Sequence, residues 1–325
     1  MDWLQELKEK NNIVEVISRY VQLQQKGGKF WCCCPFHHEK TASMCVNEDG
    51  QFYHCFGCGE SGDVITFIMK MEGMTFPEAV AFLAERAGMQ VPTPVGFQSN
   101  AESRQKRDRL YEILTLTAKF YYKSLMSDEG KDARTYLEKR GVDKNLMTRF
   151  GLGFSPSYDG VIKYLKEQGF SEAEMLDCGV AWQSDKSKRV FDALQGRMIV
   201  PIFDMRGRVV AFSGRAVTKE FSGGKYVNYR NTKVFEKGKV LYAANFVKKE
   251  KQKVAIDRVI VVEGYMDVIS LAKYGFNNAI AGMGTAFTPE QARALRTLSE
   301  NVCVCYDGDA AGQHATVRNL ETLKI

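Results

Sequence analysis

Two pairs of potential metal ligands lie near the start of the sequence. Cys34 and His37 form the first pair and Cys55 and Cys58 the second, with two residues inside each pair and 17 between the pairs. Cysteine and histidine at this spacing can reach one ion from two tight turns, which completes the tetrahedral shell that Zn²⁺ prefers. A closed shell of four protein ligands leaves no position for substrate, so we expect one structural zinc ion that stabilises a small domain.

The spacing alone does not make this ligand set unique, because Cys32 and Cys33 directly precede Cys34. The sequence contains nine cysteines, and it begins without the basic and apolar regions of a signal peptide. Cysteines in such a chain are typically metal ligands or buried thiols rather than disulfides. Ordinary buried thiols are therefore the alternative to a metal site.

A second set of residues with metal chemistry lies near the other end of the sequence. Glu263 follows the apolar run 258–262, and Asp307 and Asp309 follow the apolar run 302–306. Unbroken apolar runs that alternate with helical patterns are typical of parallel strands, and ligand sites lie at the carboxyl ends of such strands. Alternate residues of an extended segment point the same way, so the two aspartates can converge on one metal. The simpler alternative is that these acids only cap the helices that follow.

The charge distribution favours a polyanionic partner for these acids. The chain has a net charge of +6, but residues 201–255 hold 13 basic and 4 acidic residues, whereas residues 256–325 hold 6 basic and 8 acidic residues. A basic surface beside clustered carboxylates suits nucleotidyl or phosphoryl transfer with bound Mg²⁺. A merely solvated basic face is the alternative. No run of about 18 apolar residues is present, so no membrane span is expected.

The sequence pattern around these residues predicts a multidomain α+β protein whose helices and strands position them. Residues 1–92 are expected to form a zinc ribbon with flanking helices, 93–108 a linker, 109–255 a basic mixed α+β subdomain, and 256–325 an α/β subdomain with a parallel sheet. The linker is rich in proline, serine and charge and lacks an apolar period. The expected helices cover residues 12–21, 64–71, 75–88, 109–125 and 266–274, and two more begin at 288 and near 310. The expected strands cover residues 29–33, 43–47, 51–54, 198–203, 209–213, 258–262, 278–281 and 302–306.

These motifs and their order resemble the bacterial DnaG-type DNA primases. Cys-Pro-Phe-His at 34–37 and Tyr-His-Cys-Phe-Gly-Cys at 53–58 resemble the zinc motif of that family. Glu-Gly-Tyr-Met-Asp at 263–267 and Tyr-Asp-Gly-Asp at 306–309 resemble the Toprim domain, which primases share with type IA and type II topoisomerases. The resemblance spans the whole chain in the order zinc ribbon, basic domain and Toprim. It also includes Arg-Phe-Gly-Leu-Gly-Phe at 149–154, Gly-Arg-Met-Ile-Val-Pro-Ile at 196–202 and Lys-Tyr-Val-Asn at 225–228.

The resemblance implies a DNA-directed RNA polymerase, a nucleotidyltransferase that makes short RNA primers on single-stranded DNA during replication. Its substrates would be ribonucleoside triphosphates, its product an RNA–DNA hybrid, and the zinc ribbon would help to recognise the template. The implied zinc ligands are Cys34, His37, Cys55 and Cys58. The implied catalytic ligands of Mg²⁺ or Mn²⁺ are Glu263, Asp307 and Asp309, with a further part for Glu263 in proton transfer. The implied nucleotide- or DNA-binding residues are Arg149, Arg197, Arg215, Lys225, Tyr226, Asn228 and Lys237.

The same resemblance suggests other roles for residues close to the implied ligands. We expect His38 to be exposed, His54 to pack beside the ligand turn, and Asp267 to be an acid at a helix N-terminus. Two loops depart from the family pattern. Ala42 and Met44 replace a usual proline and aromatic residue, and Tyr229-Arg230 replaces Ser-Pro after the basic motif.

The resemblance also predicts partners and a location. Family members have another acidic motif on the next Toprim strand and a helical domain that binds the replicative helicase, and this sequence ends at Ile325 before both. We therefore expect an N-terminal portion of a longer primosome protein with an incomplete Toprim sheet. It would act in the bacterial cytoplasm at the replication fork as a monomer, with a ribbon that could serve another copy in trans. The rival hypotheses are DNA breakage of the topoisomerase type and single-strand binding without catalysis.

Overall fold

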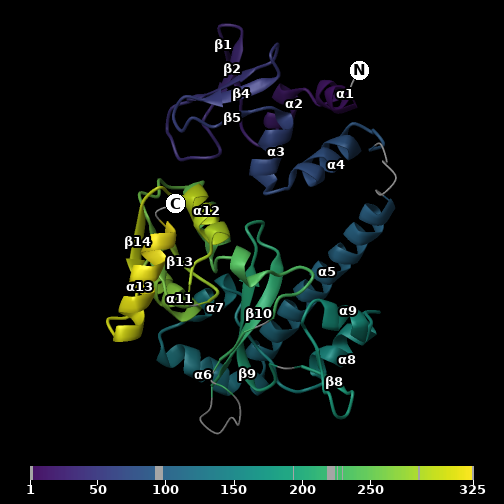
Figure 1. Ribbon diagram of the computed structural model, residues 1–325, viewed down its shortest axis with the longest axis vertical. Coiled ribbons are helices and arrows are strands. Elements are labelled where there is room, and N and C mark those ends of the chain that lie inside the picture. Colours follow the sequence, from purple (N-terminus) through teal and green to yellow (C-terminus); the bar gives the residue numbers. More distant parts are fainter. Residues whose placement is uncertain are drawn as a thin grey trace. The chain divides into compact units, whose positions relative to one another are not determined.

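The computed structural model describes residues 3–91, 98–192, 194–217, 224, 226–228, 230–284 and 286–323. The chain divides into two units, one of residues 1–100 with 249–256 and the other of residues 101–248 with 257–325 (Figure 1). Each unit has a hydrophobic core of its own. The predicted α+β fold, with a ribbon-like sheet at the start and a parallel sheet at the end, is confirmed.

The first unit is built on a five-stranded antiparallel sheet whose strands follow one another in chain order. The strands are β1 (Gln24–Lys26), β2 (Lys29–Cys32), β3 (Met44–Asn47), β4 (Phe52–Cys55) and β5 (Ser61–Gly62). Side chains alternate between the faces of a strand. Met44, Val46, Tyr53 and Cys55 are completely buried and form the core face of the sheet. Their neighbours along the strands, including Trp31 and His54, belong to the opposite face.

Four helices complete this core. They are α1 (Trp3–Lys10), α2 (Ile13–Ile17), α3 (Val64–Glu72) and α4 (Phe76–Arg86). Helix α1 was not predicted, although Leu4 and Leu7 have helical spacing. The helix predicted at 12–21 ends at Ile17, where Ser18 caps it, and the next residues form a turn. Helix α4 begins after Thr75, close to its predicted start, and Thr75 forms a capping box with Glu78.

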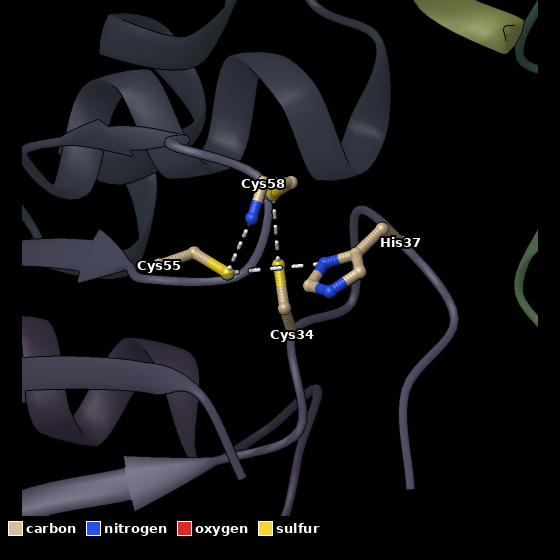
Figure 2. Close-up of side chains that lie close together, drawn as sticks. All are labelled: Cys34, His37, Cys55 and Cys58. Carbon is tan, nitrogen blue, oxygen red and sulfur yellow. Dashed lines mark hydrogen bonds between the residues drawn. The ribbon is translucent and has the colours of Figure 1, made fainter. Parts of the chain in front are cut away.

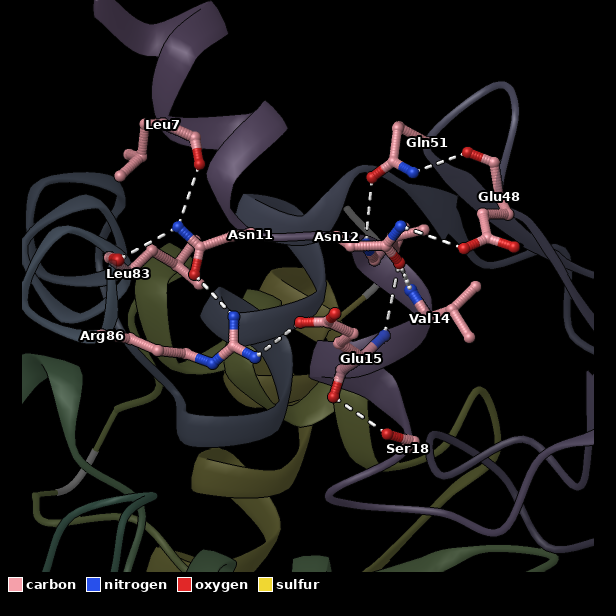
Figure 3. A network of polar contacts seen from close by, with 11 residues as sticks. Leu7, Asn11, Asn12, Val14, Glu15, Ser18, Glu48, Gln51, Leu83 and Arg86 are labelled. Carbon is pink, nitrogen blue, oxygen red and sulfur yellow. Dashed lines mark hydrogen bonds and ion pairs between the residues drawn. The ribbon is translucent and has the colours of Figure 1, made fainter. Parts of the chain in front are cut away.

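A buried polar network joins the helices of the first unit (Figure 3). The Asn11 amide donates hydrogen bonds to the carbonyls of Leu7 and Leu83 at 2.9 and 3.0 Å, and its oxygen accepts one from Arg86 at 2.9 Å. Because Asn11 is fully buried, each of these bonds satisfies a polar group that would otherwise be costly. The network fixes the junction between α1 and α2 against α4.

Most of a long helix, α5 (Gln98–Met126), belongs to the second unit, which starts at Ala101. We predicted a linker over residues 93–108 and a helix from 109, so the helix starts earlier than expected; residues 92–97 lie outside the described part. Residues 101–107 are mostly strong helix formers, Ala, Glu, Arg, Gln and Lys, although they lack an apolar period. The apolar residues that follow, including Ile113 and Tyr121, are buried, so tertiary packing stabilises the helix that these polar residues extend.

A four-stranded sheet, in the order β11-β10-β9-β6, packs with α5 in the core of the second unit. The ring of Tyr121 meets that of Phe212 on β10 edge-to-face at 5.4 Å. The predicted hairpin is present as the antiparallel pair β9–β10. The elements of this part are η1 (Asp128–Gly130), α6 (Lys131–Lys139), α7 (Lys144–Arg149), β6 (Gly153–Phe154), α8 (Gly160–Glu167), α9 (Glu172–Asp177), β7 (Trp182–Gln183), β8 (Val190–Phe191), β9 (Arg197–Phe203), β10 (Val209–Ala216), β11 (Tyr226–Asn228), η2 (Lys237–Lys239) and α10 (Ala244–Lys251).

The last segment alternates strands and helices, as its sequence predicts (yellow-green to yellow in Figure 1). Its strands are β12 (Val259–Val262), β13 (Ala279–Ala281) and β14 (Val302–Cys305), and its helices are α11 (Tyr265–Lys273), α12 (Pro289–Leu298) and α13 (Ala310–Leu323). The three strands are parallel, in the order β13-β12-β14. Val262 is paired with Ala281 on one side and Cys305 on the other, so the strands end at one edge of the sheet. Among the described residues, no helix is long and apolar enough to cross a membrane.

Candidate metal sites and nucleic-acid surface

The structure brings the four predicted zinc ligands together in the first unit (Figure 2). The Sγ atoms of Cys34 and Cys58 are 3.8 Å apart, and the Sγ atom of Cys55 is 3.8 Å from Nδ1 of His37. All four ligand atoms lie within 4.8 Å of one another. A tetrahedral zinc ion with Zn–S bonds of about 2.3 Å separates two sulfur ligands by about 3.8 Å. The donor set and its dimensions therefore fit Zn²⁺.

Two turns present these ligands, and in each turn a backbone N–H group donates to the first cysteine. The backbone N–H of Phe36 donates to Cys34 Sγ, and that of Cys58 donates to Cys55 Sγ, each at 3.4 Å. These bonds stabilise the thiolate form that metal binding requires. Gly57 allows the turns to approach, because a Cβ atom there would lie 2.6 Å from Nε2 of His37.

Glu39 supports the ligand His37, although we did not predict a role for it from the sequence. One Glu39 oxygen accepts the backbone N–H groups of Cys34 and Ser43 at 2.6 and 3.1 Å, and the other lies 3.3 Å from His37 Nε2. His37 therefore turns Nδ1 toward the ligand cluster and Nε2 toward a carboxylate, an arrangement typical of zinc-binding histidines. Burial acts to raise the pKa of Glu39, but hydrogen bonds from Ser43 and Cys34 hold it below its usual value.

The neighbouring cysteines and histidines lie outside this cluster. Cys32 is buried in the core face of the sheet, and burial raises its pKa to about 12, whereas Cys33 is exposed. The ring of His54 meets that of Phe56 edge-to-face at 4.7 Å, beside the second ligand turn as expected. His38 is partly exposed. The structure thus separates the ligand candidates that spacing left ambiguous.

The open face of the ribbon sheet carries aromatic side chains. Trp31 on β2, Cys45 on β3 and His54 on β4 occupy directly opposed positions, so their side chains share one face. The ring of Phe56 stacks on Trp31, with centroids 6.0 Å apart and an angle of 22° between the planes. Phe56 is 69% exposed and Phe52, on the same face as His54, is 45% exposed.

Basic residues extend this aromatic face. Lys26 and Lys29 are paired across the β1–β2 hairpin, and Lys29 shares the face of Trp31 because the two are at positions i and i+2 along β2. Both lysines are exposed. Large exposed aromatic rings do not contribute to the core, and rings beside positive charge can stack on unpaired bases. The sequence signal for this face was the alternation along β2 and β4, which we had used only to predict strands.

The three predicted catalytic acids lie at the common edge where β12 and β14 end. Glu263 accepts the backbone N–H of Asp307 at 2.9 Å, and Asp309 accepts that of Gly312 at 2.8 Å. A Cβ atom at Gly312 would lie 2.8 Å from the Glu263 carboxylate, so glycine is required at this start of α13. All three acids are exposed. Unlike the zinc cluster, they are not gathered into a group of three close ligand atoms in the part of the chain that the structure describes.

Asp267 lies near these acids and is the helix N-terminal acid that we expected, at the start of α11. Its carboxylate accepts the backbone N–H of Gly264 at 3.0 Å at the start of α11. Desolvation by the surrounding protein atoms raises the pKa of the Asp267 carboxyl group, and the negative charge of the nearby Asp307 raises this pKa further. The acid edge is therefore rich in negative charge, as a site for divalent cations must be.

The predicted nucleotide- or DNA-binding residues occupy different environments. Arg149 donates to Asn277 at 2.7 Å and lies over the ring of Phe150. Arg197 and Arg215 are nearly buried, on β9 and β10. Tyr226 on β11 pairs directly with Arg215, and Lys237 is half-buried in η2. Lys225 and the side chain of Asn228 lie outside the described part of the chain.

Three protein families match successive parts of the chain. They are described as CHC2 zinc finger, over residues 1–99, DNA primase catalytic core, N-terminal domain, over residues 120–248, and Toprim-like, over residues 260–325. Their order agrees with the order of the sites along the chain.

The same likeness extends to whole proteins. A DNA primase of Clostridium acetobutylicum is 40% identical over 324 residues, which is 99% of this chain and 53% of that protein. A crystal structure of the Aquifex aeolicus primase (zinc binding and RNA polymerase domains) matches 98% of this chain and 75% of its own, with a TM-score of 0.62 and 33% identity. A DnaG primase catalytic domain bound to ssDNA matches 68% and 67%, with a TM-score of 0.61 and 38% identity. The chain spans about half the length of the curated relatives it matches.

Proposed function

The chain belongs to the DnaG-type DNA primase family, and on this basis we propose that it synthesises short RNA primers on single-stranded DNA. Its substrates are ribonucleoside triphosphates, and it joins them by metal-dependent nucleotidyl transfer. The observation that carries the proposal is the shared edge of β12 and β14, where Glu263 contacts the backbone of Asp307. The acidic edge lies in the same unit as Arg215 on β10 and Tyr226 on β11.

The acids at this edge and the residues near them have different roles in the proposed reaction. Glu263, Asp307 and Asp309 are exposed carboxylates that would hold Mg²⁺ or Mn²⁺ together with substrate phosphates. A bound divalent ion would neutralise charge that develops on the phosphate during transfer. The contacts of Glu263 with Asp307 and of Asp309 with Gly312 keep two of these side chains oriented before substrate binds. Arg215 and Tyr226 supply a cation and a stacking ring for the nucleotide or the nucleic acid.

The side chains of the first unit support a role for the zinc ribbon in recognising the template. Cys34, His37, Cys55 and Cys58 would hold zinc, which would fix the two ligand turns without taking part in the chemistry. Trp31, His54 and Phe56 offer ring faces for unpaired bases, and Lys29 offers charge for the backbone. The ribbon would therefore bind single-stranded template by stacking and by electrostatic attraction.

The test of this function is template-directed incorporation of ribonucleotides on single-stranded DNA by the full-length protein. We expect Asp309→Asn to abolish synthesis, because it removes a charged metal ligand. Asp257→Asn is the matched control, since Asp257 is an exposed acid whose carboxylate pairs with the adjacent Arg258. Normal synthesis by Asp309→Asn would contradict the metal role. Relaxation of supercoiled DNA without ribonucleotide incorporation would favour the rival DNA-breakage hypothesis.

A DNA template is the partner that the similar structures support most directly. DNA in the catalytic-domain relative supports a DNA template, because that domain is 38% identical to the matching part of this chain. The replicative helicase, the monomeric state and the cytoplasmic location stay predictions from the family resemblance.

A further inference from the structure

Arg215 carries a positive charge in a nearly buried position. The residue is only 6% exposed, and its Nε atom has no hydrogen-bond partner. Among the described residues, no carboxylate lies within 4.0 Å of this guanidinium. A buried cation without a directly bonded carboxylate is costly to the fold, and an anion of a ligand bound beside the guanidinium would offset this cost.

Two tyrosine rings hold Arg215 in place of a carboxylate. The guanidinium carbon lies 5.0 Å from the ring centroid of Tyr136 on α6 and 5.0 Å from that of Tyr226 on β11. The guanidinium of Arg140, just after α6, lies 5.1 Å from the same Tyr136 ring. One tyrosine therefore holds two cations that come from different elements.

This cluster lies beside the acid edge. The ring of Tyr226 meets that of Tyr265 edge-to-face at 6.1 Å, and Tyr265 follows Glu263 and Gly264 at the start of α11. The charges of Arg140 and Arg215 both act on Asp267, next to these residues. A phosphate group bound at the acid edge would therefore lie within the field of both guanidinium groups.

We propose that Tyr136 is a positioning residue that holds Arg140 and Arg215 ready for a phosphate group of the substrate. An aromatic ring attracts a guanidinium through its π face and leaves the N–H groups available, whereas a carboxylate would occupy them and neutralise the charge. This inference rests on the proposed function, which makes a phosphate group the anion at this site. The phosphate belongs either to the incoming triphosphate or to the DNA backbone.

Tyr136→Leu in the full-length protein tests the proposal, because leucine removes the ring but keeps an apolar side chain. We expect the KM for ribonucleotides, or the Kd for single-stranded DNA without nucleotide, to rise roughly fivefold to thirtyfold, with kcat changed less than about threefold. A rise in KM alone identifies the triphosphate, and a rise in the DNA Kd identifies the backbone. Tyr136→Phe keeps the ring and should retain wild-type constants.

Tyr164→Leu is the matched control, because the ring of Tyr164 on α8 stacks on that of Phe120 at 5.3 Å, so the change removes a ring–ring contact. Its KM and DNA affinity should stay within about twofold of wild type. Arg215→Ala should remove most of the effect of Tyr136→Leu, because residues that act through one another are not additive. Full additivity of the two changes would overturn the proposal.

A second variant keeps the test decisive if Tyr136→Leu unfolds at the assay temperature. Arg215→Lys retains the charge but loses the planar group that lies on the rings, so the same rise is expected. Wild-type KM and DNA affinity in both variants, with active wild-type enzyme, would overturn the role of Tyr136. Failure of the wild-type protein to incorporate ribonucleotides would instead contradict the proposed function itself.

Discussion

The Glu39 carboxylate lies 3.3 Å from Nε2 of His37, on the side of the imidazole ring opposite the nitrogen that faces the cysteine ligands. This contact selects the tautomer in which Nδ1 is free to bind metal. The same carboxylate accepts two backbone N–H groups, so it also stabilises the loop between the ligand turn and β3.

Replacing Glu39 should weaken zinc retention. We expect Glu39→Gln to lower zinc affinity by roughly 10- to 100-fold, because a neutral amide orients the ring less strongly and leaves the histidine less basic. The measurement is zinc release to a chromogenic chelator at neutral pH. Glu85→Gln, at an exposed position on α4, is the control and should release zinc at the wild-type rate.

Removing the metal should unfold the first unit and leave the second folded. Each unit has its own core, and the core of the first is small enough that zinc binding contributes directly to its stability. Cys34→Ser should therefore lose zinc and the thermal transition of the ribbon, as measured by calorimetry with metal analysis. Cys33→Ser, one residue away but exposed and outside the cluster, should keep both. Equal zinc content in the two variants would contradict the ligand assignment.

The aromatic face of the ribbon should contribute to DNA affinity rather than to stability. Phe56 is 69% exposed, so Phe56→Ala should change the unfolding midpoint little. The loss of one stacked base is worth about 1–3 kcal/mol, and we therefore expect a roughly 5- to 150-fold weaker Kd for single-stranded DNA by fluorescence anisotropy. Tyr274→Ala provides the comparison, because Tyr274 is 70% exposed in the second unit. An unchanged Kd for Phe56→Ala would exclude the aromatic face as the binding surface.

A buried carboxyl group should give the second unit a distinctive pH dependence. Asp192 is fully buried, and burial raises its pKa to about 6, although Ser155, Tyr121 and the backbone of Leu194 all donate hydrogen bonds to it. Because the folded state binds this proton more tightly than the unfolded state, the group contributes most below about pH 4, and that contribution is lost as pH rises toward 6.

The free energy of unfolding of the wild type should therefore fall relative to Asp192→Asn by about 2–3 kcal/mol between pH 4 and pH 7. Urea unfolding of both proteins at the two pH values measures this difference directly. The comparison with Asp192→Asn removes the opposite trend of carboxyls whose pKa is lowered, such as Glu174, whose pKa the hydrogen bond from Arg109 holds at about 2. A difference that rises or stays constant with pH would contradict the assignment.

Sequence patterns predicted the features that depend on local spacing. The positions of Cys34 and His37 gave the ligand pair, and the apolar runs before Glu263 and Asp307 gave the parallel strands. We did not predict the start of α5 at Gln98, because the first turns of this helix are polar and a search for apolar periodicity does not detect them. The contact of Tyr136 with Arg215 joins positions far apart in the sequence, and only tertiary folding brings them together.

Successive residues of the ribbon strands alternate between the core face, which stabilises the fold, and the open face, which we propose binds the template. Tyr53 packs in the core while its neighbour His54 lies on the open face, and Phe30 and Trp31 divide the two faces in the same way on β2. On the proposed function, a change at a position on the open face would alter template binding without weakening the fold. Template preference and stability would then be adjustable independently in a primase with this ribbon.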